Sequence, residues 1–170
     1  NELNCEELYV CANLPYYITS PIIMMLLESK LPIENITVMV QKEAAERLCA
    51  DVGTRESGAV TVAVDYYANA KILFDVDRYS FMPPPNVDSA VIQLEIRKEP
   101  KVFVENEREF FALVKSCFAQ RRKTLVNTVS NTSNYSKDAL RKALNEIGLS
   151  ETVRAEQLSI EELAQLSNIL

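Results

Sequence analysis

The chain has 170 residues, of which 48% are hydrophobic and 25% charged, and its 18 basic and 24 acidic side chains give a formal net charge of −6. This composition is typical of a folded domain that buries a core, and it excludes disorder and any need for disulfides or a metal in folding. Histidine is absent, which removes the commonest general base and argues against hydrolytic triads and zinc hydrolases.

Cysteine spacing and apolar runs set further limits. The four cysteines lack the close spacing that zinc sites use, so we expect free thiols and no bound metal at Cys5, Cys11, Cys49 and Cys117. The longest strongly apolar run, Ile22 to Leu27, is far shorter than the ~20 residues that a membrane-spanning helix requires. Because the start carries no secretory signal, we expect a cytoplasmic protein.

The first half of the chain alternates strand and helix patterns. Residues 8–12 form a continuous apolar run, as expected for a parallel strand covered on both faces. Ser20 and Pro21 then suit the cap and first residue of a helix that ends before Leu31-Pro32. A second apolar strand at 36–41 and a helix at 42–50 follow, which predicts a mostly parallel α/β sheet of the Rossmann-like, doubly wound class.

The next segments predict an antiparallel edge to this sheet. Ile92, Leu94 and Ile96 alternate with polar residues, and residues 72–76 supply a partner strand. Residues 58–70 are ambiguous, because valines at every second position favour a strand while the alanines and the length also allow a helix.

After Pro100 the pattern becomes helical. Apolar stripes follow helical spacing from about residue 105 onward, and a capping box of Ser159 with Glu162 opens the last helix. We therefore expect two domains, the sheet domain over residues 1–103 and a helical domain over residues 104–170. Positive charge concentrates around Arg121-Arg122-Lys123, where residues 71–124 hold ten basic against eight acidic side chains.

The segment Asn13-Leu14-Pro15-Tyr16 directly follows the first strand, where ligands bind in open α/β sheets. The oxygen of the Asn13 side chain and the carbonyl of Leu14 are suited to accept the two hydrogens of an adenine 6-amino group, which draws its lone pair out of the ring. Pro15 restricts Leu14 to extended geometry, and Tyr16 offers a face for an unstacked base. The same four residues would also suit a plain strand-to-helix turn with a buried tyrosine.

Four strings occur in one order: NLPYYITSPI from Asn13, QKEAAERL from Gln41, FMPPPNVDSAV from Phe81 and FAQRRKTL from Phe118. Together they closely resemble the ribosomal RNA adenine dimethyltransferases, over nearly the whole chain. The last two strings are most similar to the branch that dimethylates two adjacent adenosines near the 3′ end of small-subunit (16S) ribosomal RNA.

The resemblance implies S-adenosylmethionine as methyl donor, with Asn13 bordering both donor and target. It also implies that Tyr16 and Phe81 hold the adenine, and that residues 58–70 are helical. Within this family Arg121, Arg122 and Lys123 are the candidates for docking 16S rRNA of the small subunit. Lys42 and Arg47 are weaker candidates, because any exposed helix face would show similar residues.

The family's glycine-rich donor loop and the acidic residue for the donor ribose are not found in this sequence. Glycine occurs at three positions only, Gly53, Gly58 and Gly148. We expect roughly 90 residues of strand-helix units to precede this segment, and we expect the segment alone not to methylate.

Two alternatives stay open. One is an adenine methyltransferase that acts on large-subunit RNA or on DNA. The other is a ribosome-assembly module that binds RNA and whose catalysis is dispensable.

Overall fold

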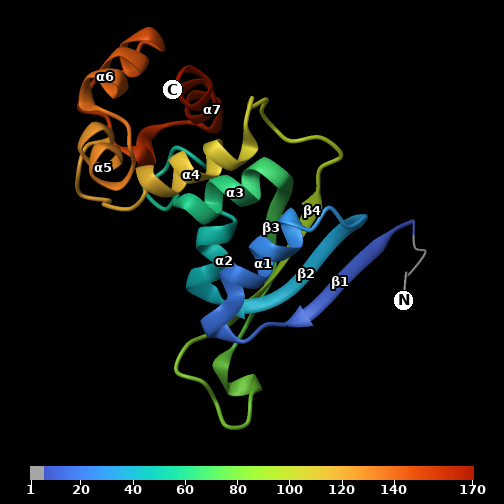
Figure 1. Ribbon diagram of the computed structural model, residues 1–170. Coiled ribbons are helices and arrows are strands. Elements are labelled where there is room, and N and C mark those ends of the chain that lie inside the picture. The colour runs from blue at the N-terminus through green and yellow to red at the C-terminus, as the bar shows by residue number, and fades with distance from the viewer. Residues whose placement is uncertain (1–5) are drawn as a thin grey trace. The chain divides into compact units, whose positions relative to one another are not determined.

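The computed structural model describes residues 6–170, which form two compact units (Figure 1). Within these residues the sheet unit comprises 6–50 and 67–101, and the helical unit comprises Asp51–Tyr66 and Val102–Leu170. The domain division at residues 103 and 104 stays a prediction. It did not anticipate that residues 51–66 pack with the helices that follow residue 102.

The sheet unit holds a mixed four-stranded sheet. Its strand order is β1-β2-β4-β3, with β1 parallel to β2 and β4 antiparallel to both of its neighbours. The strands are β1 (Leu8–Asn13), β2 (Ile33–Gln41), β3 (Ala68–Val76) and β4 (Ser89–Ile96).

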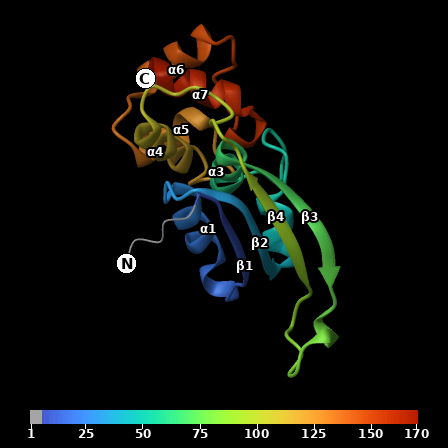
Figure 2. The same cartoon turned by 90° about the vertical axis from the view of Figure 1, so that its right-hand side faces the viewer.

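The antiparallel pair expected near the edge of the sheet is confirmed. Ile92 of β4 lies opposite Ile72 of β3, and on its other side opposite Val38 of β2. Ile92 and Leu94 are fully buried, because β4 runs between two strands and alternate residues of a strand point to the same face. The segment that joins β3 to β4 extends beyond the ends of β1 and β2 (Figure 2).

The expectation that β1 is covered on both faces is wrong for the described residues. Its side chains alternate between half-buried and exposed, and Tyr9 is 64% exposed. Within residues 6–170 no element covers the face that carries Tyr9 and Cys11. The apolar run in the sequence is therefore not buried on both faces.

Helix α1 (Thr19–Glu28) begins one residue before the expected cap at Ser20. The short 3-10 helix η1 (Tyr16–Ile18) leads directly into it, and Ile18 occupies the cap position. The hydroxyl of Thr19 donates to the carbonyls of Pro15 and Tyr16 at 3.3 and 3.4 Å. Pro21 still lies in the first turn, where its missing N–H leaves no helical hydrogen bond unmade. Helix α2 (Lys42–Leu48) follows β2 without a break and packs on the sheet.

Helix α3 (Ala59–Tyr67) decides the ambiguous segment at residues 58–70. Four consecutive residues, 61–64, are buried, whereas a strand would bury every second one. The strand interpretation of the alternating valines is wrong, and the helix implied by the family resemblance is confirmed.

Four more helices complete the helical unit. Serine, threonine or asparagine side chains cap each of them, and the capping box at Ser159 is confirmed, since Ser159 N–H donates to Glu162 Oε2 at 2.8 Å. Gly148 ends the third of them with a φ of +76°, a left-handed conformation that suits glycine. The helices are α4 (Glu107–Cys117), α5 (Leu125–Thr132), α6 (Lys137–Glu146) and α7 (Ile160–Ile169), with a 3-10 turn η3 (Ala155–Gln157) before α7.

An aromatic cluster joins the two chain segments of the helical unit. The ring of Tyr66 lies 5.5 Å from that of Phe110 and 5.2 Å from that of Phe111, distances at which such pairs are stabilising. Burial, followed by the charge and hydrogen bond of Glu107, raises the pKa of Tyr66 to about 12. Across the described residues, no helix has both the length and the apolar character needed to cross a membrane.

Candidate active site

The pairing of the strands brings three distant segments to one edge of the sheet. Asn13 ends β1 opposite Met39 of β2, and Gln41 at the end of β2 lies opposite Ser89 at the start of β4. Val76, which ends β3, is the other neighbour of Ser89. The residues that follow β1 and those that precede β4 therefore meet, although about seventy positions separate them in sequence.

A cavity of about 330 Å³ lies at this edge, in the size range of small-molecule sites. Its walls come from the end of β1 with the residues just after it, and from the loop between β3 and β4. They are Asn13, Leu14, Pro15, Tyr16, Phe81, Pro83 and Pro85. The four residues of the first motif and Phe81, which the sequence singled out separately, thus line one cavity.

Asn13 and Leu14 present polar groups at this cavity in different ways. Asn13 is exposed, and its side-chain amide makes no hydrogen bond with any residue of 6–170. The Leu14 side chain is buried, and its N–H donates to the carbonyl of Met39 at 3.1 Å. Pro15 follows with φ −60° and ψ 131°, so the chain passes extended from strand to turn. This fixes the direction of the Leu14 carbonyl.

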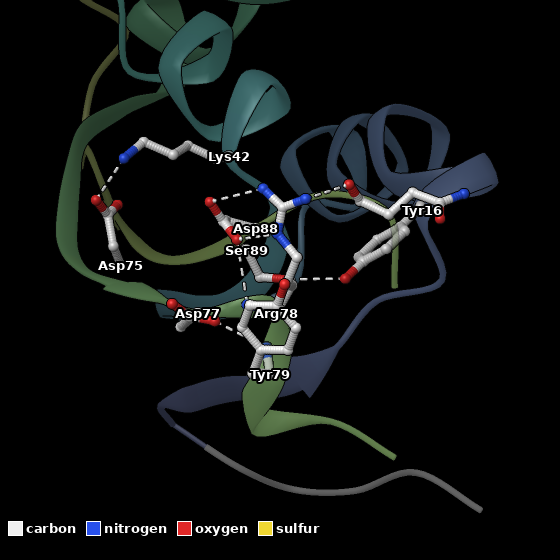
Figure 3. A network of polar contacts seen from close by, with 9 residues as sticks. Tyr16, Lys42, Asp75, Asp77, Arg78, Tyr79, Asp88 and Ser89 are labelled. Carbon is white, nitrogen blue, oxygen red and sulfur yellow. Dashed lines mark hydrogen bonds and ion pairs between the residues drawn. The ribbon is translucent and has the colours of Figure 1, made fainter. Parts of the chain in front are cut away.

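Tyr16 forms an aromatic wall of the cavity and is held at its far end. Its hydroxyl shares a hydrogen bond of 2.7 Å with the hydroxyl of Ser89, which is fully buried (Figure 3). A hydrogen bond at Oη fixes the direction in which the long axis of the ring points. The cavity therefore has one aromatic wall of set position.

Phe81 lies half-buried in the loop that joins β3 to β4, and a polar network closes this loop (Figure 3). Arg78 Nε donates to Asp88 Oδ1 at 2.9 Å, and Arg78 Nη1 donates to the carbonyl of Asn86 at 2.8 Å. The N–H of Phe81 donates to the carbonyl of Arg78 at 3.3 Å. The hydrogen bonds from Arg78 hold the pKa of Asp88 below its usual range, so this ion pair persists at neutral pH.

Ser89, Arg78 and Asp88 were not among the candidate residues from the sequence. Serine at the start of a strand and a charged pair ten residues apart carry no local pattern that separates them from surface residues. Their place in the FMPPPNVDSAV string is the only signal that was available, and it covers Asp88 and Ser89 but not Arg78.

The basic triplet lies where the sequence placed it, between α4 and α5 of the helical unit. Its members differ in their contacts. The guanidinium of Arg121 donates to the carbonyl of Arg55 and lies 3.9 Å from Glu156. Arg122 and Lys123 are exposed, and neither side chain has a hydrogen bond or ion pair within residues 6–170. Two of the three cations are thus available to phosphate groups.

The two weaker candidates on α2 each have a carboxylate partner. Lys42 pairs with Asp75, which raises the pKa of Lys42, and Arg47 pairs with Glu43 one turn earlier. An RNA phosphate would have to compete with these carboxylates, so the roles of Lys42 and Arg47 stay predictions.

Three of the four expected free thiols lie in the described residues. Cys11 is exposed, while burial raises the pKa of Cys49 to about 11 and that of Cys117 to about 12. Cys5 lies outside the described residues. Within residues 6–170 no cluster of potential metal ligands was found.

The sequence matches the ribosomal RNA adenine dimethylase family over residues 1–170. The chain belongs to this family. Curated relatives include the ribosomal RNA small subunit methyltransferase A of Bacillus pumilus, 47% identical over 100% of this chain and 59% of that protein. The same-named protein of Geobacillus thermodenitrificans is 49% identical over 95% of this chain and 56% of its own length. The chain thus spans somewhat more than half the length of these dimethylase relatives.

Solved structures agree with the family and show the Rossmann-like methyltransferase fold. A dimethyladenosine transferase from Plasmodium falciparum superposes with a TM-score of 0.77 and 28% identity, over 93% of this chain and 64% of that one. The 23S rRNA methyltransferase ErmE superposes with a TM-score of 0.70 and 26% identity, over 100% of this chain and 68% of that one. The expected fold class is therefore confirmed.

Proposed function

We propose that the protein containing this chain transfers methyl groups from S-adenosylmethionine to the 6-amino groups of two adjacent adenosines near the 3′ end of 16S rRNA, in maturation of the small ribosomal subunit. The observation that carries the proposal is the cavity at the end of β1, lined by two aromatic side chains and by Asn13, whose amide makes no hydrogen bond with any residue of 6–170. The names of the small-subunit relatives favour this RNA over large-subunit RNA or DNA. Such an enzyme would act in the cytoplasm.

The chain's own residues account for the acceptor half of the reaction. The 6-amino nitrogen of adenine is a poor nucleophile because its lone pair is delocalised into the ring. In the proposed arrangement Asn13 Oδ1 and the Leu14 carbonyl accept its two hydrogens, which favours tetrahedral geometry and stabilises the positive charge that develops on nitrogen. The strand pairing of Leu14 directs its carbonyl in advance, so little reorganisation of this acceptor accompanies the reaction.

The aromatic walls hold the base in place. Tyr16 and Phe81 line the same cavity, and stacking of a base on an aromatic ring contributes roughly 1–3 kcal/mol. The adenine has to leave its stacked position in RNA to reach this cavity. No acidic or basic side chain lines the cavity in the described residues, and the proposed chemistry requires none.

The residues present are compatible with a methyl donor next to the adenine but supply little of its site. S-adenosylmethionine would supply an electrophilic methyl group, and Asn13, exposed at the cavity, is the residue of this chain proposed to border it. The three glycines of the chain do not follow any of the four strands directly. We therefore propose that the 170-residue chain expressed alone binds the donor weakly and does not methylate. Calorimetric titration with S-adenosylmethionine tests the weak binding.

The deciding experiment replaces Asn13 by Ala in the protein at its natural length. Methyl groups on the two adenosines of unmethylated small subunits are counted by mass spectrometry. We expect kcat to fall by roughly 10²- to 10³-fold, the usual loss for one preorganised polar group in an active site, with RNA affinity unchanged.

The same experiment separates the alternatives. Full methylation by the Asn13→Ala variant would overturn the proposed chemistry. Assembly of small subunits that proceeds normally without methylation would favour the RNA-binding module. Preference for large-subunit RNA or for DNA in a competition assay would overturn the proposed substrate.

A further inference from the structure

Two consecutive residues where β4 begins hold the two aromatic walls of the cavity. Ser89, at the start of β4, bonds Tyr16, and Asp88, immediately before it, bonds Arg78 in the loop that carries Phe81. Figure 3 shows both contacts side by side. The two walls, which come from separate segments of the chain, are thus tied to two consecutive residues, Asp88 and Ser89, where β4 begins.

The strand that carries these positions is itself held on both sides. Ser89 pairs with Gln41 of β2 and with Val76 of β3, and the carbonyl of Asp88 accepts a hydrogen bond from Lys42 N–H at 3.1 Å. A side chain attached here has a well-defined position, because the backbone is fixed by two neighbouring strands and the start of α2.

The hydroxyl of Ser89 has a specific partner in a buried position. The residue is fully buried beside Ala90, and its oxygen bonds the Tyr16 hydroxyl 73 residues away in sequence. A buried hydroxyl costs stability unless it is hydrogen-bonded. Alanine would pack in the same strand position without this requirement, so stability alone does not explain a serine here.

Arg78 acts on the other wall through several contacts at once. Its backbone N–H and its Nε both donate to Asp88 Oδ1, at 3.2 and 2.9 Å, and its carbonyl accepts the N–H of Phe81. The planar guanidinium also reaches the carbonyl of Asn86. The guanidinium thus joins the two ends of the segment 78–88, and Phe81 lies between them in the sequence.

We infer that Ser89 and the Arg78–Asp88 pair are positioning residues that set the positions of Tyr16 and Phe81 around the target adenine. The inference rests on the proposed function for the identity of the base, an adenine. The tether, meaning the Tyr16–Ser89 hydrogen bond and the Arg78–Asp88 pair, does not depend on it. Neither group touches the substrate. Ser89 acts through Tyr16, and Asp88 acts through Arg78 on the Phe81 loop.

A double-mutant cycle on the protein at its natural length tests the Ser89 arm. Ser89→Ala removes the tether and Tyr16→Phe removes its partner while keeping the ring. Because misplacement by about 1 Å costs up to roughly 100-fold in rate, we expect each variant to lose about 10- to 100-fold in kcat with RNA affinity unchanged. The double variant should lose no more than either single variant, since both remove one interaction.

The control is the other fully buried serine, Ser57 of the helical unit, whose hydroxyl donates to the carbonyl of Thr54. Ser57→Ala loses a buried hydroxyl of the same kind but should leave kcat unchanged. For the Phe81 arm, Asp88→Asn should lower kcat, and Arg78→Lys should lower it less than Arg78→Gln, since lysine keeps the charge without the fork. Losses that multiply in the double variant, or an equal loss in Ser57→Ala, would overturn the inference.

A readout without RNA separates this inference from the proposed function. With 3-fluorotyrosine incorporated, the Tyr16 fluorine signal, assigned through Tyr16→Phe, should shift and narrow in Ser89→Ala and stay unchanged in Ser57→Ala. That result together with no methylation of any RNA by the unmodified protein would leave the tether standing and reject the proposed function. An unchanged Tyr16 signal in Ser89→Ala would reject the tether.

Discussion

The N–H of Leu14 donates to the carbonyl oxygen of Met39 at 3.1 Å, one residue beyond the end of β1. Strand pairing with β2 therefore continues into the motif that lines the cavity. Leu14 keeps a strand-like position while the next residue, Pro15, starts the turn into η1. Its carbonyl oxygen is directed by the sheet and not by a flexible loop.

Loosening this arrangement should slow catalysis without unfolding the protein. Pro15→Ala keeps a compatible backbone but allows Leu14 more conformations. We expect a change in unfolding free energy within about 1 kcal/mol, and a fall in kcat of about tenfold or less, since an acceptor is loosened and not removed. Thermal unfolding and steady-state methylation measure the two effects. Pro32→Ala, in the exposed turn before β2, should leave kcat unchanged.

The Phe81 wall should depend on aromaticity. Phe81→Tyr keeps a ring for stacking and should retain most activity, whereas Phe81→Leu should lower kcat/KM by roughly 5- to 150-fold, the equivalent of a 1–3 kcal/mol stack. Phe103→Leu, at a 79% exposed position of the helical unit, is the matched control and should have no effect. Equal activity of the Phe81 variants would show that the ring does not hold the base.

The members of the basic triplet should differ in their effect on RNA binding. Neutralising Arg122 and Lys123 to Gln should weaken binding and reduce the slope of log K against log salt by about one to two, because two phosphate contacts are lost. The exposed pair Lys137 and Lys142 on α6 is the control, and its neutralisation should leave the slope in place. An unchanged slope in the Arg122 and Lys123 variant would leave them as ordinary surface residues.

The Arg78–Asp88 pair should make stability depend on pH in a defined window. Since the folded pKa of Asp88 lies below its usual value, the pair contributes stability above about pH 4, the ordinary carboxyl pKa. That contribution disappears as the pH falls through the lowered pKa. Thermal unfolding from pH 3 to 7 should show a difference in Tm between the native protein and Asp88→Asn that becomes smaller as the pH falls. A difference in Tm that does not depend on pH would contradict the ion pair.

Thiol reactivity should follow burial. At pH 8 Cys11 should react with iodoacetamide first, because it is exposed, while Cys49 and Cys117, with pKa values of about 11 and 12, stay protonated and protected. Peptide mass spectrometry after timed labelling measures this order. In guanidinium chloride all three should react at similar rates, and early labelling of Cys117 in the native protein would show local opening of α4.

The sequence predicted the cavity better than it predicted the supports of the cavity. Asn13 to Tyr16 and Phe81 carry side chains whose chemistry is visible in the residue types, and the structure brings all of them to one cavity. Ser89 has no such visible chemistry. Its hydroxyl gains significance only from the register of β4 against β2 and β3, which depends on pairing across the whole sheet.

The secondary structure was misread where local pattern and packing disagree. Valines at 60, 62 and 64 alternate as in a strand, but burial of all of residues 61–64 selects a helix. At Ser20 a favourable cap residue was outweighed by η1, which continues directly into α1 and places the helix start at Thr19. In both places the deciding interaction lies outside the window that a sequence pattern covers.

The helical unit is built from two separate stretches of chain, 51–66 and 102–170. Tyr66 contributes from the first stretch and Phe110 and Phe111 from the second, and their rings pack together. A polypeptide ended at residue 101 would leave the ring of Tyr66 without those of Phe110 and Phe111. We therefore expect it to expose an aromatic side chain that the longer chain buries.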